Sequence, residues 1–242
     1  MTTMLLIHAF PLDASMWDEQ VKALREETEV LAPSLPGWGG TEPIGDVLTM
    51  DAAADFLAGE LDRAEVENAI VCGLSIGGYI AFSLWRRHRN RIAGLLLADT
   101  RAEADDEAGK ERRRAVAEKA LAEGNAPMVE NPPPLLSEGA DPALWERVKE
   151  VIRRQPGEAI AAAALGMAER PDSTPILPSI DVPTTIVVGS ADTLTPPPMS
   201  EKMVESIPGA ELIVLEGAGH LSNVESPEEF LEALRKLAAR VG

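Results

Sequence analysis

The chain has a single cysteine among its 242 residues, Cys72, so no disulfide can form within it. Cys72 lies in an apolar run, where a buried small side chain is expected rather than a reactive thiol. No apolar run approaches the roughly 18 residues of a membrane span. The N-terminus also lacks the basic segment and cleavage site of a signal peptide. We therefore expect a cytoplasmic protein that does not bind membranes.

Positive charge is scarce as well, since 22 Lys and Arg stand against 40 Asp and Glu and give a formal net charge of −18. A surface of this sign repels nucleic acids and anionic lipids, so neither is expected as a partner. The length fits one α/β domain, or an α/β core with an inserted subdomain. The composition does not indicate an oligomeric state.

Short apolar segments alternate with helical patterns in both the first and the last part of the chain. We predict strands at Met4–Ile7, Glu29–Ala32, Asn68–Cys72, Gly94–Ala98, Thr184–Val188 and Glu211–Leu215. Helices are predicted at Trp17–Glu26, Thr49–Leu61, Ser75–His88, Pro197–Ser206 and Ser226–Ala239. Apolar strands that alternate with helices are typical of a parallel sheet covered on both faces.

The alternation stops at Arg101 and resumes near residue 179. Between them the sequence is helical or proline-rich, with helical patterns at Glu103–Ala122, Asp141–Arg154 and Gly157–Glu169. We therefore predict that residues 1–101 and 179–242 form the α/β core. Residues 102–178 are predicted to form a helical cap inserted in that core.

A Gly-x-Ser-x-Gly motif, Gly73 to Gly77, lies between a predicted strand and a predicted helix. This pattern is typical of a nucleophile elbow, in which a strained turn lifts the serine hydroxyl off the sheet. The flanking glycines allow the strand and the helix to approach closely. Ser75 is therefore the candidate nucleophile, although a structural Gly/Ser turn would read the same way.

A serine needs a base to remove its proton and an acid to orient that base. His220 follows the last predicted strand in a glycine-rich loop, whereas His88 ends a helix and His8 is expected to shape its own loop. Asp192 follows the predicted strand Thr184–Val188. Asp99, at the end of another strand, is the rival acid. The order serine, Asp192, His220 is the order of residues expected in a nucleophile-elbow triad.

An acyl-transfer site also needs two N–H donors for the oxyanion of the transition state. One is expected from Ile76, directly after the serine. The other is expected from Phe10, in the loop after the first strand. No metal or organic cofactor is required by this chemistry.

Five segments together resemble the α/β-hydrolase superfamily over nearly the whole chain. They are His8-Ala9-Phe10-Pro11, Pro36-Gly37-Trp38-Gly39, Gly73-Leu74-Ser75-Ile76-Gly77-Gly78, Gly189-Ser190-Ala191-Asp192 and Gly217-Ala218-Gly219-His220. The first has alanine where the family has glycine. The resemblance implies an α/β-hydrolase fold. Two strands that usually precede the first one are missing here, so a mostly parallel six-stranded sheet is expected, in the family's order 4-3-5-6-7-8.

The chain is most similar to small capped carboxylesterases and 3-oxoadipate enol-lactonases. The resemblance implies that a small-molecule ester or lactone is cleaved through an acyl-enzyme. A cofactor-free perhydrolase and a non-catalytic small-molecule receptor remain alternatives. The cap is expected to roof the pocket with apolar side chains, and half of them are expected to be only cap core: Leu135, Leu136, Trp145, Val148, Ile152, Leu165 and Met167.

The core loops are expected to add Phe10, Leu12, Trp38 and Leu221 to the pocket. Arg101 lies where the cap begins and has two readings. It could bind the carboxylate of an enol-lactone, or it could form a salt bridge with Glu103 or Asp105. Which ester or lactone is cleaved does not follow from the sequence.

Overall fold

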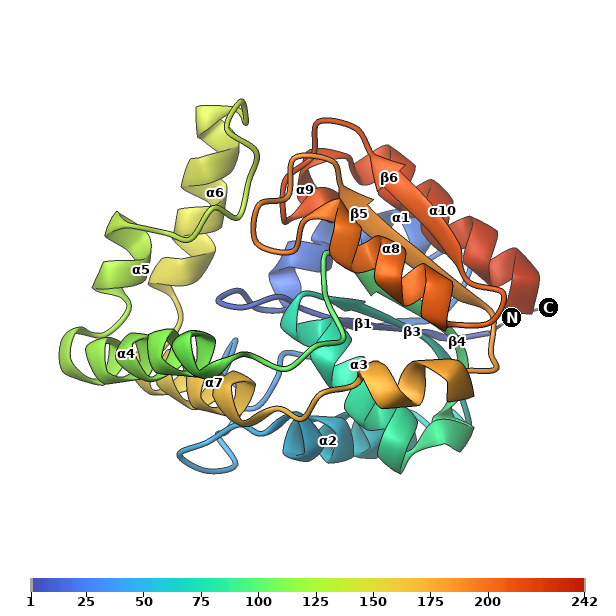
Figure 1. The fold of residues 1–242 in the computed structure, drawn as a ribbon, viewed down its shortest axis with the longest axis horizontal. Coiled ribbons are helices and arrows are strands. Elements are labelled where there is room, and N and C mark those ends of the chain that lie inside the picture. Colours follow the sequence, from blue (N-terminus) through green and yellow to red (C-terminus); the bar gives the residue numbers. More distant parts are fainter. Residues whose placement is uncertain (1, 242) are drawn as a thin grey trace.

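A computed structural model describes residues 2–241, and its centre is a six-stranded, all-parallel sheet (Figure 1). The strands are β1 (Met4–Ile7), β2 (Val30–Leu31), β3 (Ala69–Leu74), β4 (Ile92–Ala98), β5 (Thr184–Gly189) and β6 (Glu211–Leu215). Their order in the sheet is β2-β1-β3-β4-β5-β6. This confirms the predicted order, since the family's strands 3 to 8 correspond to β1 to β6. Neighbouring strands pair in parallel throughout, for example Leu6 beside Cys72.

Helices cover both faces of the sheet. The core helices are η1 (Ala14–Trp17), α1 (Asp18–Leu24), α2 (Met50–Arg63), α3 (Ile76–Arg87), η2 (Arg89–Arg91), η3 (Thr174–Ser179), α8 (Pro197–Ser206), α9 (Ser222–Glu225) and α10 (Pro227–Val241). One face of the sheet packs against α2, α3 and α8, and the other face packs against α1 and α10. Because both faces are covered, every residue of β3 and β5 is buried. This explains the continuous apolar runs in these strands.

Four α-helices lie between β4 and β5, before η3, where the alternation of strands and helices stops. They are α4 (Glu107–Glu123), α5 (Ala126–Glu130), α6 (Pro142–Arg153) and α7 (Gly157–Glu169). α4 packs along the buried, alanine-rich α7, and α5 and α6 extend away from the sheet (Figure 1). Among residues 2–241, the structure has no strand between Ala98 and Thr184.

The structure departs from the predicted elements at several ends. The helix predicted from Trp17 begins earlier as the 3₁₀ turn η1, because the Asp13 side chain accepts the Ser15 N–H at 3.0 Å and caps it. The helix predicted from Glu103 begins at Glu107 instead, with Asp106 as its cap. The short helices α5 and α9 were not predicted, since four or five residues show no clear periodicity. Within residues 2–241, no helix is both long and apolar enough to cross a membrane.

Candidate active site

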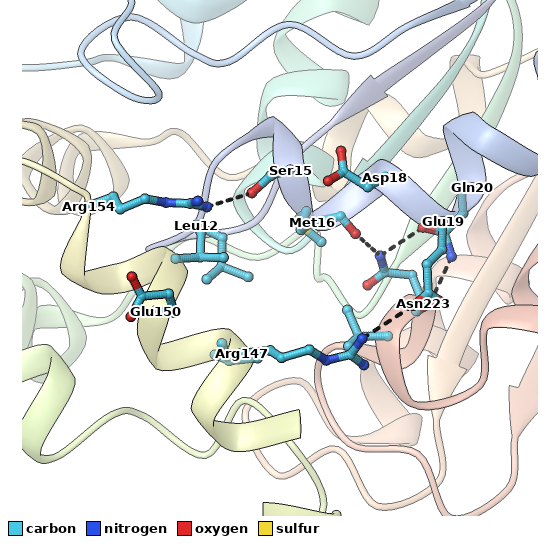
Figure 2. A pocket seen from close by; sticks show the side chains of 13 residues that line it. Leu12, Ser15, Met16, Asp18, Glu19, Gln20, Arg147, Glu150, Arg154 and Asn223 are labelled. Atoms are coloured by element: carbon cyan, nitrogen blue, oxygen red, sulfur yellow. Dashed lines mark hydrogen bonds and ion pairs between the residues drawn. The ribbon is translucent and has the colours of Figure 1, made fainter. Parts of the chain in front are cut away.

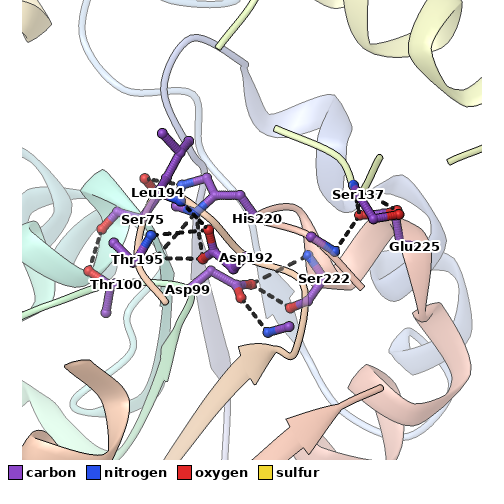
Figure 3. Close-up of polar contacts among 12 residues, drawn as sticks. Ser75, Asp99, Thr100, Ser137, Asp192, Leu194, Thr195, His220, Ser222 and Glu225 are labelled. Carbon is purple, nitrogen blue, oxygen red and sulfur yellow. Dashed lines mark hydrogen bonds and ion pairs between the residues drawn. The ribbon is translucent and has the colours of Figure 1, made fainter. Parts of the chain in front are cut away.

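Three residues singled out in the sequence meet at the carboxyl ends of the strands (Figure 3). Ser75 follows β3, Asp192 follows β5 and His220 follows β6. The Ser75 hydroxyl lies 2.9 Å from Nε2 of His220, and Nδ1 of His220 lies 2.9 Å from Oδ2 of Asp192. The carboxylate can only accept, so Nδ1 carries the ring proton and Nε2 is free to accept from the serine. The ring is thus oriented as a general base requires.

Ser75 has the strained backbone expected of an elbow, with φ of 58° and ψ of −115°. The strain is held in place by β4 and the turn after it, because Ser75 N–H donates to the Ala98 carbonyl and the Ser75 carbonyl accepts from the Thr100 hydroxyl at 2.8 Å. The elbow depends on its glycines. A Cβ on Gly73 would lie 2.2 Å from the Gly77 carbonyl oxygen, so no larger residue fits there.

Asp192 is held as a carboxylate by four donors. Its Oδ1 accepts the N–H groups of Leu194 and Thr195 at 2.8 and 3.1 Å, and its Oδ2 accepts the Thr195 hydroxyl at 2.6 Å besides His220. Burial by itself would raise the pKa of Asp192, but the hydrogen bonds and charge of His220 and the bonds from Thr195 outweigh it and lower the pKa. Asp192 is therefore negatively charged at neutral pH and can stabilise an imidazolium.

The two residues predicted to bind an oxyanion, Phe10 and Ile76, both lie close to Ser75. Ile76 is the first residue of α3, so its N–H has no carbonyl of its own helix to bond. Phe10 lines the cavity above the serine, in the loop after β1. Within residues 2–241, no group of three or more His, Cys, Asp or Glu side chains is arranged to hold a metal ion.

His8 stabilises the loop of Phe10. Its Nε2 accepts the Leu35 N–H at 3.0 Å, and its Nδ1 lies 3.1 Å from the Ala9 carbonyl. Burial lowers the pKa of His8 from 6.5 to about 4, against smaller opposing effects of Ala9 and Asp13. His8 is therefore neutral and joins the loop after β1 to the loop after β2.

Within residues 2–241, Asp99 forms no hydrogen bond with His220. Its carboxylate instead accepts the N–H of Gly189 at 2.9 Å and the hydroxyl of Ser222. It is fully buried, and burial raises its pKa to about 7, together with the charge of Asp192 and against the opposing effect of His220. Of the two aspartates, Asp192 is the one whose carboxylate contacts the imidazole of His220.

A cavity of about 310 Å³ lies over Ser75 and His220, bounded by core loops and by the helices between β4 and β5. Its lining also includes Phe10, Tyr79, Arg101, Arg113, Val116, Met128, Asn131, Pro133, Leu135, Met167, Leu194 and Thr195. Arg101 and Leu135 are the residues of the predicted pocket found there, with Phe10 and Met167. The sequence missed Thr195, although an aspartate followed by Thr193-Leu194-Thr195 is typical of a turn in which the side chain accepts nearby N–H groups.

Eight residues of the predicted pocket do not line this cavity and require a correction: Leu12, Trp38, Leu136, Trp145, Val148, Ile152, Leu165 and Leu221. Leu12 instead lines a separate cavity between η1, α1 and α6 (Figure 2). Trp38 is buried beside the loop after β1, with its ring edge-on to His8 and Phe10 at 5.9 Å between centroids. Trp145, within α6, is partly buried against the core. Leu221 is fully buried in the core, because neighbouring side chains diverge and that of His220 faces the cavity.

Arg101 has both of the arrangements considered for it. It lines the cavity, and it also forms a salt bridge with Asp105. Asp105 binds two further guanidinium groups, those of Arg113 at 3.3 Å and Arg170 at 2.8 Å. Burial would raise the pKa of Asp105, but these three arginines, Arg170 most strongly, lower it to about 2. One carboxylate therefore faces three cations at the edge of the cavity.

Known proteins resemble this chain over nearly its full length. Residues 4–233 match the alpha/beta hydrolase family. A pimeloyl-[acyl-carrier protein] methyl ester esterase of Neisseria meningitidis is 28% identical, over 95% of this chain and 74% of that protein. A 3-oxoadipate enol-lactonase of Acinetobacter baylyi is 30% identical, over 91% of this chain and 82% of that protein.

Among solved structures, a thermophilic esterase from Thermogutta terrifontis, with malate bound, superposes with a TM-score of 0.96. It is 42% identical in sequence and covers 100% of this chain and 90% of its own. Esterases and enol-lactonases are carboxylic ester hydrolases, the enzyme class predicted from the sequence. The match to the family spans both sides of the inserted helices and includes all the segments that carry the site. The chain therefore belongs to the alpha/beta hydrolase family.

Proposed function

We propose that the chain hydrolyses small carboxylic esters through an acyl-enzyme on Ser75. The observation that carries this proposal is the continuous path of two 2.9 Å contacts from Ser75 through His220 to Asp192, below a cavity of about 310 Å³. A cavity of this size suits a small ligand. The helices α4 to α7, within residues 102–178, act as the cap of a core made of residues 1–101 and 179–242.

The reaction follows from the direction of the hydrogen bonds. The Ser75 hydroxyl oxygen attacks the ester carbonyl as its proton passes to Nε2 of His220. The N–H groups of Phe10 and Ile76 stabilise the oxyanion, each by roughly 3 kcal/mol. His220 then returns the proton to the leaving alkoxide. A water molecule, deprotonated by His220, attacks the acyl-enzyme and releases the acid, while Asp192 stabilises the imidazolium.

A stoichiometric burst with 4-nitrophenyl butyrate tests this proposal. The acyl-enzyme predicts one equivalent of nitrophenolate per chain, and labelling of Ser75 by an organophosphonate. Ser75→Ala is expected to lower kcat by about 10⁵- to 10⁶-fold, and Asp192→Asn by about 10⁴-fold. Absence of both burst and labelling would instead favour a non-catalytic small-molecule receptor. Replacing water by hydrogen peroxide as acyl acceptor tests for perhydrolysis in the same assay.

A second candidate, hydrolysis of an ester or lactone that carries a carboxylate, is favoured by the cations at the cavity. Arg101 and Arg113 both line it, and its lining by residues 2–241 contains no Asp or Glu. Asp105 neutralises one charge of the three that it binds. The related T. terrifontis esterase was solved with malate, a dicarboxylate. These observations support the enol-lactonase alternative, whose substrate is anionic.

Two esters of equal length separate the candidates. Mono-4-nitrophenyl glutarate carries a carboxylate where 4-nitrophenyl pentanoate carries a methyl group. Arg101→Ala is expected to lower kcat/KM for the glutarate by about 10-fold or more, since a charge-assisted hydrogen bond contributes roughly 1.5–3 kcal/mol. The pentanoate is expected to change by less than about 3-fold. An equal loss on both esters would show that Arg101 does not select charge.

A further inference from the structure

Two carboxylates outside the proposed reaction, Asp99 and Glu225, form hydrogen bonds with the segment that carries His220, one from each side (Figure 3). Asp99 lies on the side of the sheet, at the end of β4. Its Oδ1 accepts the Gly189 N–H at 2.9 Å, at the start of the Asp192 loop. Its Oδ2 accepts the hydroxyl and, at 3.4 Å, the N–H of Ser222, two residues after His220. A single carboxylate therefore joins the loop of the acid to the loop of the base.

Glu225 forms hydrogen bonds with the same segment from the side of the inserted helices. It accepts the N–H of Gly219, directly before His220, at 2.7 Å. It also accepts the hydroxyl of Ser137 at 2.6 Å and the Ser137 N–H at 3.0 Å. Ser137 belongs to the connector between α5 and α6, which contributes Pro133 and Leu135 to the cavity. Glu225 thus ties the base to the wall of the pocket.

The contact between connector and histidine segment is tight over several residues. Leu221 N–H donates to the Leu135 carbonyl at 2.8 Å. A Cβ on Gly219 would lie 2.4 Å from the Ser137 nitrogen, so the backbones approach each other as closely as glycine allows. Movement of the connector would therefore carry the histidine segment with it.

Asp99 has the features of a residue that positions its neighbours rather than one that stabilises the fold. It is fully buried, where an ionised carboxylate is costly and an apolar side chain of similar size would not be. Its backbone has a φ of 45°, in the left-handed region, which is uncommon for residues other than glycine although Asp adopts it more readily than most. Strained backbone of this kind is concentrated at functional sites, where the surroundings enforce it.

We propose that Asp99 and Glu225 are positioning residues that hold Gly219–Ser222 from its two sides, and that they set the distance from His220 to Ser75. The proposal rests on the proposed ester hydrolysis, because it assigns these carboxylates a role in aligning the base. Neither carboxylate exchanges a proton with substrate. Each acts through the backbone next to His220.

The test uses four variants in the full chain, with 4-nitrophenyl acetate as substrate, above about pH 8 where Asp99 is ionised. Asp99→Asn and Glu225→Gln keep the shape and remove the acceptor charge, and Ser222→Ala and Ser137→Ala remove one donor to each carboxylate. Asp99→Asn and Glu225→Gln are expected to lower kcat by about 10- to 100-fold with KM within about 3-fold, since a small displacement of a catalytic group costs rates of this order. The serine variants are expected to lower kcat in the same direction by about 3- to 10-fold. Glu205→Gln, at an exposed position of α8, is the matched control with unchanged kcat.

A double-variant cycle distinguishes positioning from a structural role. In the His220→Ala background, the base is absent, so Asp99→Asn and Glu225→Gln are expected to have no further effect on residual activity. A further loss equal to that seen with His220 present would overturn the proposal, as would unchanged kcat in all four variants. If Asp99→Asn or Glu225→Gln does not fold, Ser222→Ala and Ser137→Ala decide. If wild-type protein shows no hydrolysis and Ser75 is not labelled, the proposed function fails instead.

Discussion

His8 and Asp99 are buried groups that respond to acid in opposite directions, which gives a quantitative prediction for stability. The pKa of His8 is lowered by burial from 6.5 to about 4, so the unfolded chain binds a proton before the folded chain does. The free energy of unfolding therefore falls as the pH drops from about 6.5 to 4. The contribution lost between pH 7 and pH 5 is about 2 kcal/mol.

Asp99 has the opposite sign. Burial raises its pKa from 3.8 to about 7, so the folded chain takes up the proton first. Its contribution to the free energy of unfolding rises as the pH drops from about 7 to 4, by about 2 kcal/mol between pH 7 and pH 5. The two contributions offset each other in the wild-type protein. In a variant that lacks one of the two groups, the pH dependence that the other gives to the free energy of unfolding becomes measurable.

The assay is urea unfolding at pH 7, 6 and 5 of the wild type, His8→Gln and Asp99→Asn. Relative to the wild type, His8→Gln is expected to gain about 2 kcal/mol between pH 7 and pH 5, and Asp99→Asn to lose about 2 kcal/mol. All other titrating groups are common to the three proteins and cancel in these differences. Parallel stability profiles for the three proteins would refute the reasoning, and so would slopes of equal sign in the two variants.

Two further outcomes follow from the site. Asp105→Asn leaves three guanidinium groups without their shared carboxylate, and we expect a loss of about 3 kcal/mol in the free energy of unfolding, measured by urea titration; a change below about 1 kcal/mol would contradict a structural role for this cluster. Thr195→Val removes the hydroxyl that donates to Asp192 at 2.6 Å, and we expect kcat for 4-nitrophenyl acetate to fall by about 10-fold with an unchanged melting temperature; unchanged kcat would mean that the remaining donors orient the acid alone.

The fold could be predicted from the sequence where local chemistry marks the ends of elements. The structure has Gly157–Glu169, Pro197–Ser206 and Glu211–Leu215 with the predicted bounds, since proline or glycine begins both helices and glycine and proline precede the strand. The start of α4 was predicted four residues too early. Asp105 is bound by Arg170, which is 65 residues away in the chain, so no local pattern could indicate that this aspartate lies outside the helix.

The candidate site divides in the same way. Ser75, Asp192 and His220 each follow a predicted strand, and parallel strands bring their carboxyl ends to one edge of the sheet, so these residues could be identified. The pocket could not be predicted as well, because an apolar side chain beside a residue of the candidate site can face either the cavity or the core. Leu221 and Trp38 face the core, and only the packing of the loops decides this.

The sequence suggested that Arg101 either binds a substrate carboxylate or forms a salt bridge, but the two roles are compatible. A guanidinium has five N–H donors in a plane, so a salt bridge does not exhaust it. Asp105 accepts a hydrogen bond from one terminal nitrogen of Arg101. The buried Nε of Arg101 has no hydrogen-bond partner within residues 2–241. The same carboxylate also serves Arg113 and Arg170, and it cannot neutralise all three. The salt bridge therefore fixes Arg101 at the cavity wall and leaves it cationic there, which is the arrangement that binding a substrate carboxylate requires.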